Sequence, residues 1–171
     1  MEKKYFVSDI IAAIVHRELS VYYQPKYDAT TNRMKSAEAL VRWIKKDGSV
    51  ILPERFLHAM EQSDAITMLD WYVVEEVCAF LERLKGEGIR PLPVSVNFSR
   101  WHLHEEDAAR RLSDILDAHR LDHSLIVVEI TESAMIDEEE RMRAMVDGLH
   151  AKGFDTNLNL NFNHLALSFP P

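Results

Sequence analysis

Apolar residues along the chain follow two different periods, and the two kinds of segment alternate. A spacing of three and four residues, typical of amphipathic helices, covers residues 8–18, 65–85, 104–120 and 137–153. Short, mostly apolar runs typical of strands cover residues 21–26, 37–43, 93–98 and 125–130. Because strands and helices alternate from about residue 20 to residue 153, the pattern predicts an α/β domain with parallel strands and outer helices.

The last part of the chain has a different pattern. Leu158, Leu160 and Phe162 alternate with asparagines, which predicts a half-buried strand over residues 157–162 that pairs with the strand at 127–131. After His164 the alternation shifts by one residue, and such a shift indicates a bulge or a turn. We expect the segment beyond it to fold back or to contact another copy. A homodimer through the open sheet edge is one way to pair the backbone groups of that edge.

Composition narrows the classes of protein to which the chain can belong. The 171 residues are 47% hydrophobic, enough for one domain with a core, and the net charge of −8 disfavours binding to a nucleic acid polymer. The single cysteine, Cys78, rules out a disulfide framework within the chain and is expected to be a small buried side chain. No signal peptide and no membrane span are recognisable, so we expect a cytoplasmic protein.

Polar residues inside the apolar strands are the candidates for chemistry. Glu38 lies in one strand, Asn97 ends the next, and Glu129 and Glu132 end the third. Because the carboxyl ends of parallel strands meet at one face of a fold, these side chains are expected to converge. Carboxylate and amide oxygens suit Mg²⁺ or Mn²⁺, and Arg42 could then hold a phosphate with two hydrogen bonds.

Each of these residues also has a simpler interpretation. A single glutamate at a strand end is more often solvated or ion-paired than a metal ligand. An asparagine before a serine is most often a turn former. His102 and His104 suggest a zinc site by their spacing, but no partner motif accompanies them, and exposed loop histidines are the better interpretation.

Five motifs occur in a characteristic order: YYQP, AEALVRW, GSVILPERF, VSVNFS and VVEITES. The segment LDWYVVEEVCAFL between them also fits, and the similarity extends from about residue 7 to residue 154. In order and spacing they resemble the EAL domain family. The resemblance implies a modified eight-stranded β/α barrel whose first strand is antiparallel to the others. It also implies the hydrolysis of cyclic di-GMP to the linear dinucleotide with Mg²⁺ or Mn²⁺.

The resemblance assigns roles to individual residues. Glu38, Asn97 and Glu129 are similar to the metal ligands of the family, and the two glutamates therefore belong to its catalytic set. Glu132 is similar to a catalytic-site glutamate that steadies the loop after the following strand. The positions that contact the cyclic dinucleotide in the family correspond to Gln24, Leu40 and Arg42.

The resemblance fails in the tail, residues 155–171. Where the family carries two adjacent aspartates before Phe-Gly, this chain reads DTNLNLNFNHL, and Asp155 stands too early to replace them. The family's later lysine, glutamate and glutamine would lie beyond Pro171. We therefore expect one EAL-like domain over residues 1–171, incomplete at its C-terminus, with about five strands in a partial barrel. A truncated or frame-shifted chain, a degenerate domain, and a tail that covers the edge in its own way all remain open.

The sequence thus predicts an EAL-type cyclic di-GMP phosphodiesterase domain that is weak or inactive as an enzyme. The alternative is a non-catalytic module that binds cyclic di-GMP or joins protein partners. An unrelated α/β protein with chance motifs is the third possibility.

Overall fold

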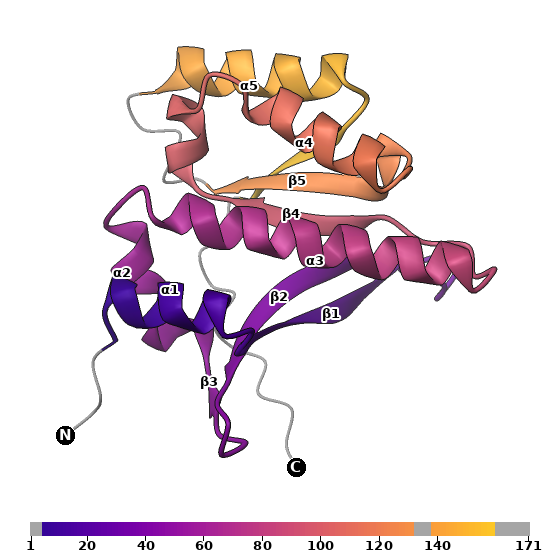
Figure 1. Cartoon of the computed structure of the whole chain (residues 1–171). Helices are drawn as coiled ribbons and strands as arrows, with labels where there is room; N and C mark the ends of the chain where they lie inside the picture. Colours follow the sequence, from indigo (N-terminus) through magenta and orange to yellow (C-terminus); the bar gives the residue numbers. More distant parts are fainter. Residues whose placement is uncertain (1–4, 132–137, 160–171) are drawn as a thin grey trace.

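The computed structural model describes residues 5–131 and 138–159, which form alternating helices and strands (Figure 1). The helices are α1 (Val7–Val15), α2 (Leu57–Glu61), α3 (Ile66–Gly86), α4 (Ala108–Ala118) and α5 (Glu139–Ala151). Three 3-10 helices are η1 (Pro53–Arg55), η2 (Arg100–His104) and η3 (His123–Leu125). The strands are β1 (Leu19–Tyr27), β2 (Met34–Ile44), β3 (Val50–Ile51), β4 (Val94–Phe98), β5 (Ile126–Thr131) and β6 (Asp155–Asn159).

The six strands form one sheet in the order β1-β2-β4-β5-β6, with the short β3 beside β2. Strands β2, β4, β5 and β6 are parallel, whereas β1 is antiparallel to β2. The α/β class, the four expected strands and the antiparallel first strand are therefore confirmed, and the arrangement is that of a partial β/α barrel. The two-residue β3 was not predicted, because it is too short to show a period.

The tail joins the sheet where the sequence pattern places it. Strand β6 lies parallel to β5, with Val127 opposite Asp155 and Thr131 opposite Asn159. The predicted pairing is thus confirmed for residues 157–159. The structure does not describe Glu132 or residues 160–171, which include Leu160 and Phe162. The expected turn near His164 therefore stays a prediction.

One face of the sheet is apolar and is covered by helices α3, α4 and α5 (Figure 1). Because strand side chains alternate between faces, every second residue of β2, β4 and β5 contributes to this face. These buried residues are Ala37, Ala39, Val41, Trp43, Val94, Val96, Phe98, Ile126, Val128 and Ile130. The core therefore lies between the sheet and its helices, and the other face of the sheet is left to the polar residues.

Helix α3 supplies much of the covering layer. Its 21 residues bury an apolar stripe that includes Leu69, Val77 and Leu81. Cys78 is fully buried in the same stripe, as expected, and burial raises the pKa of its thiol to about 12. The thiol therefore stays protonated near neutral pH, which suits packing and not nucleophilic chemistry.

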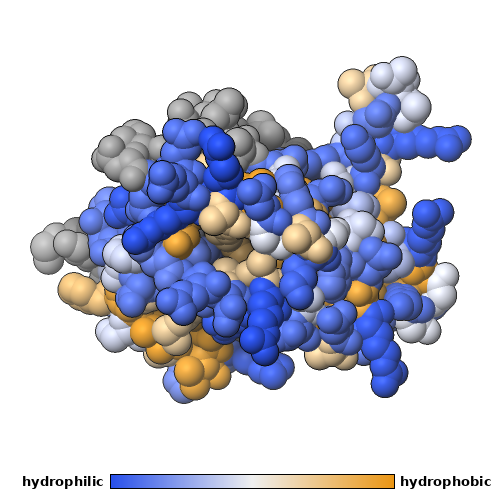
Figure 2. Space-filling model, turned by 90° about the horizontal axis from the view of Figure 1, so that it is seen from above, coloured by the Kyte–Doolittle hydropathy of each residue, from blue (hydrophilic) through white to orange (hydrophobic). Residues whose placement is uncertain are grey.

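The surface is mixed in character. Figure 2 shows hydrophilic side chains over most of the viewed face, with apolar side chains gathered in smaller areas. Within residues 5–131 and 138–159, no helix has both the length and the apolar character that crossing a membrane requires.

Candidate functional site

Two buried glutamates from different strands share one lysine on the polar face of the sheet. The ammonium of Lys26 lies 2.6 Å from Glu129 Oε1 and 3.2 Å from Glu38 Oε2. It also donates to the hydroxyl of Ser95, at 3.4 Å. The side chains of Glu38 and Glu129 are only 5% and 4% exposed, whereas that of Lys26 is 39% exposed. The carboxylates are thus fixed in the sheet, and the lysine closes over them.

Strand register explains why these groups meet. Gln24 of β1 lies opposite Glu38 of β2, so Lys26, two residues later, lies on the same face. Glu38 lies opposite Ser95 of β4, which is two residues before Asn97. Three neighbouring strands therefore contribute to one polar face, and Glu129 adds a fourth, β5.

Asn97 of β4 belongs to the same row of side chains. It lies opposite Glu129 of β5, and Glu129 lies in turn opposite Asn157 of β6. Directly opposite residues on neighbouring strands direct their side chains to the same face. The structure therefore brings Glu38, Asn97 and Glu129 to a common face. It does so although Glu38 stands in the middle of β2 and not at its carboxyl end.

The charges at this site nearly balance. Burial lowers the pKa of Lys26, but its hydrogen bond to Glu129 and the negative charges of Glu129 and Glu38 outweigh that effect, so the pKa is raised. Two carboxylates and one ammonium still leave one net negative charge. Glu38 Oε1 is buried and has no hydrogen-bond partner among the described residues. An unpartnered buried oxygen is costly, and a cation would satisfy it.

These groups fit a divalent ion that prefers oxygen ligands. Glu38 and Glu129 would supply carboxylates, and Asn97 an amide carbonyl, as Mg²⁺ and Mn²⁺ favour. The unpartnered Glu38 Oε1 is the observation that supports this fit. Within the described part of the chain, no cluster of three or more His, Cys, Asp or Glu side chains could hold a metal ion. An ion here would therefore depend on amide and water oxygens beside the two glutamates.

The predicted ligand-binding residues lie on the same face. Leu40 and Arg42 follow Glu38 at intervals of two residues along β2, and Gln24 lies directly opposite Glu38. All three are half-buried. Arg42 donates one hydrogen bond to the Val41 carbonyl, at 2.9 Å, and its planar group carries further donors.

The expectation for His102 was wrong, because its side chain is fully buried. Its Nε2 lies 3.1 Å from Asp70 Oδ2 and its Nδ1 lies 2.6 Å from Glu105 Oε2, while the ring stacks on Phe98 at 4.1 Å. Helix η2 folds this segment against α3, which brings Asp70 within reach. His104 is exposed, as expected, and pairs with Glu138.

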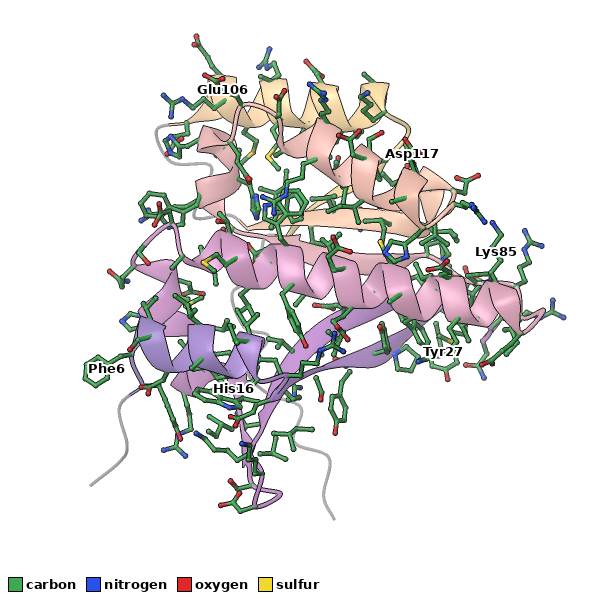
Figure 3. All side chains as sticks on the ribbon, viewed as in Figure 1. Phe6, His16, Tyr27, Lys85, Glu106 and Asp117 are labelled. Atoms are coloured by element: carbon green, nitrogen blue, oxygen red, sulfur yellow. The ribbon has the colours of Figure 1, made fainter. Side chains whose placement is uncertain are left out.

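Sequence reasoning missed two contributors to the site. Lys26 could have been found, since it follows Gln24 by two residues in a strand and must share its face. Asp70 gave no such signal, because its contacts depend on how α3 packs against the segment after β4. The residue after Lys26, Tyr27, is exposed at the end of β1 (Figure 3).

The sequence model of the family described as EAL domain matches residues 8–162. The oxygen sensor protein DosP of Escherichia coli K12 is 29% identical over 154 residues, which are 86% of this chain and 19% of DosP. The cyclic di-GMP phosphodiesterase PdeR of the same organism is 29% identical over 147 residues, 86% of this chain and 22% of PdeR.

Solved structures agree with the sequence matches. The PaMucR phosphodiesterase in its c-di-GMP complex superposes with a TM-score of 0.82 at 25% identity, over 95% of this chain and 65% of that chain. The FimX EAL domain superposes with a TM-score of 0.81 at 18% identity, which shows the fold. The chain spans about a fifth of the length of DosP and PdeR. The family match over most of its length shows that this chain belongs to the EAL domain family.

Proposed function

We propose that this domain binds cyclic di-GMP on the polar face of its sheet and is an EAL-type phosphodiesterase domain with weak or no turnover. The observation that carries the proposal is the pair of buried glutamates, Glu38 and Glu129, held together beside Asn97 on that face. Curated relatives named as cyclic di-GMP phosphodiesterases and a similar structure that contains c-di-GMP support the choice of ligand.

The proposed roles follow from the chemistry of each side chain. Arg42 would hold a phosphate through its unused guanidinium donors, and Gln24 and Leu40 would bind the remainder of the dinucleotide. Glu38, Asn97 and Glu129 would hold Mg²⁺ or Mn²⁺. When bound, such an ion polarises a phosphodiester oxygen and promotes the ionisation of water. Glu132, which lies outside the described residues, would steady the neighbouring loop.

The sequence of β6 favours weak turnover. Strand β6 places the neutral Asn157 directly opposite Glu129, and the segment around it carries no pair of adjacent aspartates. Loss of several groups that act together generally costs orders of magnitude in rate. A non-catalytic module that binds cyclic di-GMP is therefore the second candidate, and it uses the same Gln24, Leu40 and Arg42.

Two further parts of the proposal concern the setting of the domain. We place it in the cytoplasm, where a soluble dinucleotide signal would reach it. We also propose that two copies associate through the sheet edge, since β6 ends the strand order in the described part of the chain. Light scattering at low micromolar concentration tests this association, and a monomer with an ordered tail would contradict it.

Titration calorimetry with cyclic di-GMP and Mn²⁺, combined with chromatography of the products, tests the function. We expect binding that R42A weakens about tenfold or more, because a charge-assisted bidentate contact is lost. The matched control is R90A, an exposed arginine that lies after α3. We expect linear dinucleotide to stay near the background level. Absence of binding by the wild-type chain would contradict the proposal, and rapid metal-dependent product formation would contradict the weak turnover.

A further inference from the structure

We propose that the Lys26 ammonium is a built-in cation that competes with a divalent metal ion for the Glu38–Glu129 pair. Metal binding would then require the lysine side chain to leave the two carboxylates. The proposal rests on the proposed function, because it assigns Glu38 and Glu129 as metal ligands.

The contacts of Lys26 are those of a cation held by ligands. Its nitrogen lies 2.6 Å from one carboxylate and 3.2 Å from the other, with the Ser95 hydroxyl at 3.4 Å. These oxygens come from strands β2, β4 and β5, while the lysine comes from β1. An ion bound by both glutamates would lie between the same two carboxylates as the ammonium does. The ammonium and the ion therefore cannot both occupy this place.

The two partners differ in their freedom to move. Glu38 and Glu129 are almost completely buried and stand in the interior of paired strands. The Lys26 side chain is 39% exposed and has a flexible four-carbon stem, so it can turn toward solvent without moving the backbone. Lysine is also strongly hydrated, which favours the released state. Displacement thus requires motion of one side chain only.

Charge gives a reason for a divalent ion to replace the lysine. With Lys26 in place the cluster keeps one net negative charge, and Glu38 Oε1 has no hydrogen-bond partner among the described residues. A divalent ion would neutralise the two carboxylates and could also bind that oxygen. The lysine stabilises the site without metal and, for the same reason, weakens its affinity for metal.

The test compares Mn²⁺ binding by the wild-type chain and by K26M, measured by titration calorimetry without nucleotide. Methionine keeps an unbranched apolar side chain and removes the positive charge. We expect K26M to bind Mn²⁺ at least about tenfold more tightly, since the competing charge is gone. The matched control is K35M, an exposed lysine of β2, which should stay within about twofold of the wild type. K26R keeps the charge and should not bind more tightly than the wild type.

Thermal unfolding supplies a second measurement. Removal of the ammonium takes away a charge that compensates two buried carboxylates, so K26M should unfold at a lower temperature than the wild type in EDTA. Added Mn²⁺ should raise the Tm of K26M more than that of the wild type or of K35M. Should K26M be unfolded in EDTA, its refolding on addition of Mn²⁺ supports the proposal. Failure to refold overturns it.

The results separate this inference from the proposed function. Equal Mn²⁺ affinity in the wild type and K26M overturns the competition, while the cyclic di-GMP assay stands unaffected. If K26M binds Mn²⁺ and the wild type does not, the lysine excludes the metal ion completely, which supports the competition. Absence of Mn²⁺ binding by every variant overturns both the competition and the metal site. Cyclic di-GMP binding would then remain as the function of a module that works without metal.

Discussion

The carboxylate of Asp70 on α3 accepts a hydrogen bond from the backbone N–H of Ser99, at 3.1 Å. Ser99 stands two residues after Asn97, at the point where β4 ends. The same Asp70 oxygen lies 3.1 Å from Nε2 of the buried His102. A helix on the apolar face of the sheet therefore fixes the end of the strand that presents Asn97 on the polar face.

Replacing Asp70 by alanine should lower the free energy of unfolding by about 1–3 kcal/mol, because the Ser99 N–H and the His102 ring each lose a buried partner. Urea unfolding measures this loss, and faster hydrogen exchange at the Ser99 amide should accompany it. D114A, at an exposed position of α4, serves as the control and should change stability by less than about 0.5 kcal/mol. An unchanged Ser99 exchange rate in D70A would argue against the anchoring role.

Phe98 should be one of the most sensitive core positions. It is fully buried, stacks on His102 and meets Trp71 edge to face at 5.2 Å. Its replacement by alanine should cost about 3–5 kcal/mol, because a cavity would open directly beside Asn97. Denaturant unfolding is the measurement, and F6A is the matched control, since Phe6 is 62% exposed (Figure 3). Similar stability of F98A and F6A would contradict this description of the core.

The thiol of Cys78 should be unreactive in the folded protein. Burial and the nearby glutamates raise the pKa of the thiol to about 12, so almost no thiolate forms at about pH 8. We expect a disulfide reagent such as DTNB to label the native chain only as fast as the chain unfolds, and to label it at once in guanidinium chloride. Rapid labelling of the native protein would show that α3 opens locally.

His119 should make stability depend on pH. Its hydrogen bond to Glu82, at 2.6 Å, raises its pKa despite partial burial, and Glu75 adds to the effect. A raised pKa in the folded state stabilises the protein below the unfolded value of 6.5, and this stabilisation is lost as the pH rises through the folded pKa.

The variant H119N should therefore be less stable than the wild type by about 0.2–1 kcal/mol near pH 5.5, and the difference should shrink near pH 8.5. Urea unfolding at the two pH values measures it. H16N, at an exposed histidine outside this pair, is the control variant. The opposite trend in H119N, with a larger difference at high pH, would rule out the ion pair as the cause.

The side-by-side arrangement of the four strands and the face shared by Glu38, Asn97 and Glu129 could be predicted, because apolar runs that alternate with helices indicate one shared sheet. The apolar runs and their alternation with helices are local patterns, so one sequence reveals them. The placement of the cation of Lys26 over the two glutamates depends on β1 folding back along β2. That pairing was expected only through the resemblance to the family.

His102 shows why the remainder could not be predicted. A histidine between a strand and a helix has no local signal for burial. Its position is stabilised by Asp70, distant in sequence, and by Glu105, which is close to it only because η2 bends the chain. The polarity of a side chain predicts exposure unless tertiary structure supplies hydrogen-bond partners.

The pairing of β1 with β2 also governs how the domain can vary. The register is regular from Leu19 to Lys26 and shifts between Lys26 and Tyr27, just before the turn at residues 28–33. A one-residue change upstream of this irregularity would exchange the faces of β1 and move Gln24 and Lys26 to the helix side. A change in the turn itself can be absorbed where the pairing is already irregular. The turn at residues 28–33 can therefore change in length during evolution, whereas the paired part of β1 cannot. An insertion in the paired part would move Gln24 and Lys26 away from the site together.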